Sequence, residues 1–466
     1  MSVRGMTRMV RMVAGVLAGA LCGDAAGVER PNVVIIYADD LGWGDLGCYG
    51  APAIRTPQLD RMAAEGMRFT DFYSAAEVCT PSRAALLTGR YAVRSGMSHD
   101  RYRVLRANAS GGLPMEEETL AEVLKGVGYA TGMVGKWHLG HLAEHLPGKH
   151  GFDWYFGMPF SNDMMPAAGA PAGREKFFRE DVALWETPLL RGEAVLEAKP
   201  DQRQLTKRYT EEAVAFIRER KAGPFFLYMA HTFPHVPLFA SEAFRGRSPG
   251  GIYGDVVEEL DWSVGRVLEV LREERLAERT LVFFSSDNGP WTVFGSHGGS
   301  AEPLRDGKGS TWEGGMRVPG IAWWPGKIAA GVVQREVALT MDLVPTCAKL
   351  AGAAMPERAL DGVDLAPLLF GGGMVERDVF LYYRGTEVYA ARLGKWKAHF
   401  RSRSGYGTDA VVVHDPPLLF HLGEDPGERW DRAGEQPEVV KKIREAVAKK
   451  TAAVTVGVSQ LEATVR

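Results

Sequence analysis

Three short stretches of the chain are apolar at nearly every position: Pro31–Ala38, Pro224–Ala230 and Thr280–Ser286. A continuous apolar run of this length predicts a β-strand that is buried on both faces. In Gly251–Glu274, by contrast, apolar residues recur every three or four positions. This spacing predicts an amphipathic helix with one face toward the core.

Three shorter helices are predicted between the first two of these strands. Thr56–Gly66 has apolar residues at helical spacing, Pro81–Gly89 has a proline in its first turn, and Glu117–Gly128 ends in a glycine. Strands that alternate with helices indicate an α/β fold. We therefore expect a large mixed, mostly parallel sheet that is sandwiched by helices.

Near residue 375 the pattern changes to short strands without long helices between them. The predicted elements are Val379–Tyr383, Val388–Phe400 with a turn at Leu393–Gly394, Leu418–Leu422 and a terminal helix at Pro437–Ala452. We expect a large domain over residues 28–375. A smaller α+β subdomain with an antiparallel sheet is expected over residues 376–466.

The first 27 residues have the features of a signal peptide. Arginines precede the apolar run Met12–Leu21, and small residues follow that run. The run is shorter than the roughly 20 apolar residues of a membrane span. An uncleaved anchor and a misassigned start are the alternatives. We expect export to the periplasm or the medium, and no stable membrane span elsewhere.

The composition argues against a nucleic-acid partner and against a fold held by disulfides. The 466 residues carry a net charge of −3 and contain no block of Lys or Arg, so nothing favours nucleic acid as a partner. The four cysteines are too few for a disulfide framework, and Cys22 lies in the leader. Cys48 and Cys347 could pair only if the fold brought them together.

Polar clusters follow the predicted strands at their carboxyl ends, where ligands bind in open α/β sheets. They are Asp39-Asp40 after the first strand, Lys136-Trp137-His138 after Tyr129–Val134, His231 to His235 after the second strand, and Asp287-Asn288-Gly289 after the third. The recurrence of one placement is stronger evidence for a site than any single cluster.

The acidic clusters favour a hard cation. Asp39, Asp40, Asp287 and the Asn288 carbonyl form an all-oxygen set, which suits Ca²⁺ or Mg²⁺ and not zinc. Adjacent carboxylates also repel each other unless a cation offsets their charge. A helix cap at Asp39-Asp40 and a plain turn at Asp287-Asn288-Gly289 remain as structural alternatives.

Cys79 precedes the predicted helix Pro81–Gly89. The positive end of a helix dipole favours an anion or a thiolate at such a position. A Cys nucleophile and a small buried apolar side chain are both compatible with the pattern. No Cys-His pairing can be established from the sequence.

The segment that starts at Cys79, with the sequence CTPSRAALLTGR, resembles the signature of the formylglycine-dependent sulfatase family, and the arylsulfatase type in particular. The similarity extends over essentially the whole chain after the leader. It includes PNVVIIYADDLGWGDLGCYG at 31–50, GKWHLG at 135–140, SSDNGP at 285–290, GKGSTWEGGMRVPG at 307–320 and PPLLFHLGEDPGER at 416–429. The resemblance implies an alkaline-phosphatase-like fold.

The resemblance also implies a set of roles for residues of this chain. A maturation enzyme of the host would convert Cys79 to Cα-formylglycine. One divalent cation, calcium with magnesium as the alternative, would be bound by Asp39, Asp40, modified Cys79, Asp287 and Asn288. Arg83 and Lys136 would hold the aldehyde hydrate, and His138 would act as its base. Lys136, Ser161, His235 and Lys308 would contact the sulfate, with His235 and Lys308 facing the leaving group and His231 structural.

The function implied is hydrolysis of a sulfate monoester carried by an aryl group, a glycan or a glycolipid. A phosphate or phosphonate ester hydrolase on the same scaffold is the first alternative, although two-zinc phosphatases use Asp-His where this chain has Asp287-Asn288. The second alternative is a carbohydrate-binding protein with a relict site, which predicts loss of a site residue, and none is lost. Trp43, Trp291 and His297 are candidates for the pocket wall or for core packing.

Overall fold

The computed structural model describes residues 30–464, and its centre is a ten-stranded sheet. The strand order is β11-β2-β10-β9-β1-β8-β4-β5-β6-β7. In chain order these strands are β1 Asn32–Ala38, β2 Met67–Phe69, β4 Ala130–Gly135, β5 Trp154–Gly157, β6 Leu189–Arg191, β7 Ala194–Glu197, β8 Phe225–Ala230, β9 Thr280–Ser286, β10 Gly320–Trp323 and β11 Val332–Gln334.

The middle of this sheet is parallel and carries the apolar runs. β9, β1, β8, β4 and β5 run in one direction, whereas β10, β6 and β7 make antiparallel pairings. The three strands predicted from continuous apolar runs become β1, β8 and β9, and all their residues are buried. The prediction of a large mixed, mostly parallel sheet is confirmed.

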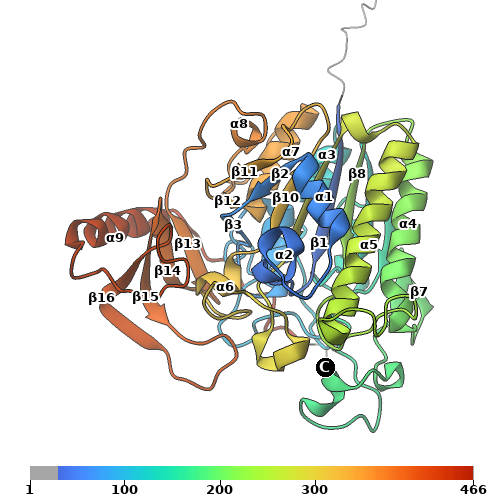
Figure 1. The fold of residues 1–466 in the computed structure, drawn as a ribbon, viewed down its shortest axis with the longest axis horizontal. Coiled ribbons are helices and arrows are strands. Elements are labelled where there is room, and N and C mark those ends of the chain that lie inside the picture. The colour runs from blue at the N-terminus through green and yellow to red at the C-terminus, as the bar shows by residue number, and fades with distance from the viewer. Residues whose placement is uncertain (1–29, 465–466) are drawn as a thin grey trace, which may run out of the picture.

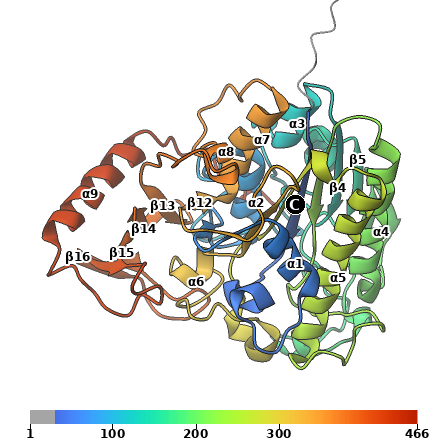
Figure 2. The same ribbon diagram turned by 45° about the horizontal axis from the view of Figure 1, so that its top comes forward.

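Helices cover both faces of the sheet (Figures 1 and 2). On β1, Val33, Ile35 and Tyr37 pack with one set of helices, and Val34 and Ile36 pack with the other. The first set is α2 Cys79–Thr88, α3 Leu120–Lys125, α7 Leu343–Ala351 and α8 Ala366–Leu369; the second is α1 Pro57–Glu65, α4 Leu205–Arg220 and α5 Gly251–Glu273. Strict alternation on a strand places one core on each face.

A separate antiparallel sheet lies beside the large one, at the left of Figure 1. It contains β13 Phe380–Arg384, β14 Glu387–Leu393, β15 Trp396–Ser402 and β16 Val412–His421, and α9 Pro437–Ala452 packs against it. The short helix α6 Glu313–Met316 and the two-stranded pair of β3 Phe72–Tyr73 with β12 Ala338–Leu339 complete the elements. The predicted C-terminal sheet and helix are confirmed, whereas the division of the chain at residue 375 stays a prediction.

Two helices differ from the prediction. α2 begins at Cys79 rather than at Pro81, because Val78 is its extended N-cap residue. The expected helix over Glu117–Gly128 is only the six residues of α3, because Thr119 caps it by accepting a hydrogen bond from the Glu122 amide.

Some predictions concern the termini and the cysteines. The predicted signal peptide over residues 1–27 lies outside the described residues. Within residues 30–464, no helix is long and apolar enough to cross a membrane. Cys48 and Cys347 are unpaired. They pack with the cores on opposite faces of the large sheet, so they do not form a disulfide.

Candidate active site

The polar clusters predicted from the sequence meet at one edge of the large sheet. Asp39 and Asp40 follow β1, Lys136 follows β4, His235 follows β8 and Asp287 follows β9. Because these strands are parallel neighbours, their carboxyl ends lie together. All five side chains are buried, so their charges must be balanced within the site.

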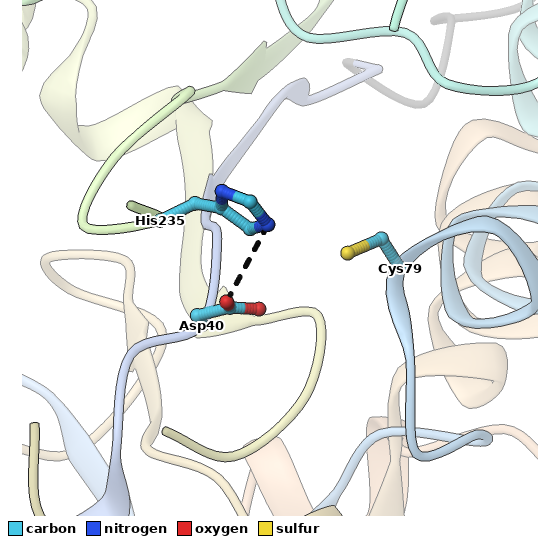
Figure 3. A group of neighbouring side chains, drawn as sticks. All are labelled: Asp40, Cys79 and His235. Atoms are coloured by element: carbon cyan, nitrogen blue, oxygen red, sulfur yellow. Dashed lines mark ion pairs between the residues drawn. The ribbon is translucent and has the colours of Figure 1, made fainter. Parts of the chain in front are cut away.

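Acidic and sulfur atoms form a compact group at this edge. One ligand atom each from Asp39, Asp40, Cys79 and Asp287 lie within 4.8 Å of one another. Figure 3 shows Cys79 at the start of α2, with its sulfur directed toward Asp40 and His235. His235 Nε2 lies 3.7 Å from Asp40 Oδ2.

Three cations surround these carboxylates. Lys136 Nζ lies 2.6 Å from Asp39 Oδ2, and Lys308 Nζ lies 2.7 Å from Asp40 Oδ1. Arg83 binds Asp287 Oδ2 through Nε and Nη2 at 3.0 and 2.9 Å. It also donates through Nη1 to the Lys136 carbonyl at 2.8 Å. Arg83 therefore links the helix that carries Cys79 to two strand ends.

The acids do not titrate alike. Burial would raise the pKa of Asp39, but the nearby charges, Lys136 first, hold the pKa of that carboxyl well below its usual range. Burial raises the pKa of Asp40, and burial together with the charge of Asp39 raises the pKa of Asp287 to about 7. Burial is the largest influence on both groups, so the nearby cations offset only part of the cost of ionising Asp40 and Asp287.

A divalent cation fits this donor set. Asn288 Nδ2 donates to Asp40 Oδ1 at 2.7 Å, whereas Asn288 Oδ1 is buried and has no hydrogen-bond partner. An orphaned buried carbonyl oxygen beside three buried carboxylates is the ligand chemistry of a hard cation. The residues predicted for the metal lie together, and a bound cation would give the Asn288 oxygen a partner.

Cys79 is the first residue of α2, and its Sγ lies 3.5 Å from Asp39 Oδ1. Burial raises the pKa of the Cys79 thiol well above its ordinary value, although Lys136 and Lys308 act in the opposite direction. Burial therefore acts against the thiolate that the helix dipole would favour at this position. A neutral thiol is a poor nucleophile, so the unmodified side chain offers little chemistry.

The two predicted histidines each leave one ring nitrogen available. His138 Nε2 lies 3.0 Å from the Leu105 carbonyl, which can only accept, so Nε2 carries the proton. Its Nδ1 is buried and unpartnered, and burial lowers the pKa of the ring well below 6.5. His235 Nδ1 donates to the Val236 carbonyl at 2.5 Å and lies 3.5 Å from Ser161 Oγ. His138 is thus neutral and able to accept a proton.

Of the remaining candidate residues, one contacts the site and the others pack elsewhere. His231 lies against α5, with Nε2 3.5 Å from Ser263 Oγ, as expected for a structural histidine. Trp43 packs edge-on against Tyr49, and His297 packs against Phe178. Of the three aromatic candidates, Trp291 contacts the site, since Lys308 Nζ lies 4.3 Å from its ring centroid.

One residue beside the site was missed. Tyr406 lies between β15 and β16, and its ring centroid is 4.9 Å from that of Trp291. No pattern in the sequence could have identified it, because a glycine-rich loop has no period and the contact spans more than a hundred residues.

The profile of the family described as Sulfatase matches residues 31–353. The chain belongs to the sulfatase family. The profile described as the C-terminal region of aryl-sulfatase matches residues 375–465. Arylsulfatase A of Bos taurus is 44% identical over 95% of this chain and 92% of its own length. N-acetylgalactosamine-6-sulfatase of Sus scrofa is 43% identical over 92% of this chain and 87% of its own length.

Solved structures confirm the fold of this sulfatase. The PsFucS1 sulfatase from Pseudoalteromonas superposes with a TM-score of 0.81 at 29% identity, covering 91% of this chain and 90% of its own. The phosphonate monoester hydrolase of Agrobacterium radiobacter superposes with a TM-score of 0.62 at 18% identity, covering 91% and 96%. The second likeness shows the shared fold alone. The predictions of family and of an alkaline-phosphatase-like fold are confirmed.

Proposed function

We propose that this sulfatase hydrolyses sulfate monoesters with a formylglycine made from Cys79 and one bound divalent cation. The observation that carries the proposal is the buried group of three carboxylates around Cys79, matched by Lys136, Lys308 and Arg83. A sulfate ester is an anion, and positive groups in a dry site stabilise the charge that develops on it during reaction. Membership of the sulfatase family supports the same chemistry.

Asp39, Asp40, Asp287, Asn288 and residue 79 would hold the cation, with calcium the first candidate and magnesium the second. When bound, the cation would polarise the sulfate, and the aldehyde hydrate at residue 79 would supply the hydroxyl that attacks sulfur while the bond from sulfur to the leaving oxygen breaks. Lys136 and Arg83 orient residue 79 through their contacts with Asp39 and Asp287. His138, neutral and with a free Nδ1, takes up the proton that must leave the hydrate.

His235 and Lys308 serve the leaving-group side of the site. Both contact Asp40, and Ser161 joins His235 as a further contact for the sulfate oxygens. Protonation of the leaving oxygen matters more for a sugar alcohol than for a phenol, because an alkoxide is the poorer leaving group. The similarity to an arylsulfatase and to an N-acetylgalactosamine-6-sulfatase supports an aryl, glycan or glycolipid sulfate as the substrate class.

Two further expectations belong to this proposal. A maturation enzyme of the host would modify Cys79 before the chain folds, since the folded site buries that side chain. The leader over residues 1–27 would direct the chain out of the cytoplasm.

The experiment is a comparison of 4-nitrophenyl sulfate with 4-nitrophenyl phosphate on chain that carries formylglycine. We expect kcat/KM to be higher for the sulfate by about 100-fold, or about 3 kcal/mol of transition-state binding. Cys79→Ala should abolish turnover, and the exposed Lys395→Met should leave it unchanged. Faster hydrolysis of the phosphate would favour the phosphohydrolase alternative, and binding without turnover would favour a relict site.

A further inference from the structure

Trp291 is a partly exposed residue that contacts two of the proposed catalytic groups. Its ring centroid lies 5.3 Å from that of His235 and 4.3 Å from Lys308 Nζ. The side chain is half-buried, and its indole Nε1 is buried without a hydrogen-bond partner. The tryptophan therefore offers part of an aromatic face beside the two residues assigned to the leaving group.

Tyr406 reaches the same place from the loop between β15 and β16. Its ring centroid lies 4.9 Å from that of Trp291. Gly309, next to Lys308, leaves room for it, because a Cβ there would lie 2.8 Å from Tyr406 Cε2. The tyrosine is also half-buried. The C-terminal sheet thus contributes an aromatic ring beside Lys308.

The loop that carries Tyr406 is tied down on several sides. Asp306 Oδ2 accepts a hydrogen bond from the Gly405 amide at 3.2 Å. Arg384 donates to the Ser404 and Gly405 carbonyls at 3.1 and 3.2 Å. The Arg103 guanidinium lies 5.5 Å from the centroid of the Tyr406 ring, and its Nε is buried and unpartnered. These contacts hold the tyrosine in place before any ligand arrives, which lowers the entropy cost of binding.

We infer that Trp291 and Tyr406, whose rings contact each other, form one aromatic surface, called the clamp, on which the ring of the leaving group packs while Lys136, Lys308 and His235 hold the sulfate. This inference rests on the proposed function. Two fixed aromatic rings next to a cluster of cationic side chains suit an ester in which a ring carries the sulfate. The shared chemistry is a ring with an apolar face, supplied by either an aryl group or a sugar.

Tyr406 gives the cleaner test, because Trp291 also contacts Lys308 and packs against Phe294. The full-length enzyme with formylglycine would be assayed with 4-nitrophenyl sulfate and with a monosaccharide 6-sulfate. Inorganic sulfate, which has no ring, would be measured as a competitive inhibitor. We expect Tyr406→Leu to raise KM for at least one ring ester by about tenfold. The inhibition constant of sulfate should change by less than about twofold, and Tyr406→Phe should restore most of the lost affinity.

The outcomes separate the clamp from the function beneath it. The size of the rise in KM for each ester shows whether the clamp favours an aryl or a sugar ring. The exposed Trp430→Leu, in the C-terminal region, is the matched control and should leave every constant unchanged. Unchanged KM values in Tyr406→Leu, or a parallel rise in the sulfate inhibition constant, would overturn the clamp alone. A wild-type enzyme with formylglycine that hydrolyses no sulfate ester would overturn the proposed function, and the clamp with it.

Discussion

The side-chain amide of Asn288 has one group with partners and one without. Asn288 donates through Nδ2 to Asp40 and to the Gly289 carbonyl, which fixes the orientation of the amide. Its Oδ1 is left buried and unpartnered. A buried acceptor without a partner costs about 1–3 kcal/mol, so a ligand that satisfies it is strongly favoured. A bound cation would give this oxygen its partner, as it would the neighbouring carboxylates.

Asn288→Ala should therefore weaken the binding of calcium. In chelator-treated enzyme, added Ca²⁺ should raise the thermal midpoint, because a ligand that binds the folded state stabilises it. We expect the variant to need about tenfold more Ca²⁺ for the same rise. Parallel titrations with Mg²⁺ would identify the preferred ion. An identical Ca²⁺ dependence in the two proteins would contradict the assignment of Asn288 as a ligand.

Strand ends determine where the catalytic side chains lie. Gly135 ends β4 with a φ of +105°, and a Cβ there would lie 1.8 Å from the Ala230 carbonyl of β8. The next residue, Lys136, donates its amide to that same carbonyl at 2.7 Å. A glycine is needed at this point because both the backbone angle and the close approach exclude a side chain.

Gly135→Ala should force β4 away from β8 and move Lys136. A shift of about 1 Å at a catalytic group lowers the rate by about 100-fold, so we expect a loss of that order in kcat/KM. The thermal midpoint should also fall. Gly148→Ala is the control, since its Cβ would meet nothing within 4 Å and its φ is ordinary. Equal activity of the two variants would show that the strand end does not position Lys136.

The same elements show how far the sequence allows prediction. The apolar runs identified β1, β8 and β9 because strands buried on both faces have no polar positions. The acidic residues and His235 could be predicted as site residues because they come directly after those strands. The last two strands of the sheet order, β6 and β7, were not predicted, because they are short and partly exposed. Tyr406 could not be predicted, since its place depends on how the two sheets meet.

At the scale of the whole molecule, a buried ionic network joins the two sheets. Lys397 on β15 lies 2.9 Å from Glu313 Oε1 on α6 and 3.0 Å from Glu428 Oε1, and it donates to the Thr311 carbonyl at 2.8 Å. Burial would raise the pKa of Glu313, but Lys397 and two arginines lower it to about 2. Thr311 and Glu313 lie three and five residues after Lys308 of the active site. The contacts of Lys397 with them therefore connect the C-terminal sheet to the segment that carries Lys308.

Lys397→Met should remove the cation that the buried carboxylates of Glu313 and Glu428 share. Breaking a buried pair in this way costs about 3–5 kcal/mol, and we expect the free energy of unfolding to fall by that amount. The measurement is denaturant unfolding of the full-length protein. The exposed Lys395→Met, two residues away, should have little effect. Equal stability of the two variants would mean that the network does not hold the sheets together.

The central claim is that residue 79 is a formylglycine, and the mass of the tryptic peptide Phe69–Arg83 tests it most directly. Conversion of cysteine to formylglycine removes about 18 Da from the peptide. Protein made in its own host should give the lighter mass, and its sulfate ester hydrolysis should increase with the fraction converted. A peptide found wholly at the cysteine mass in an enzyme that still hydrolyses sulfate esters would contradict the account.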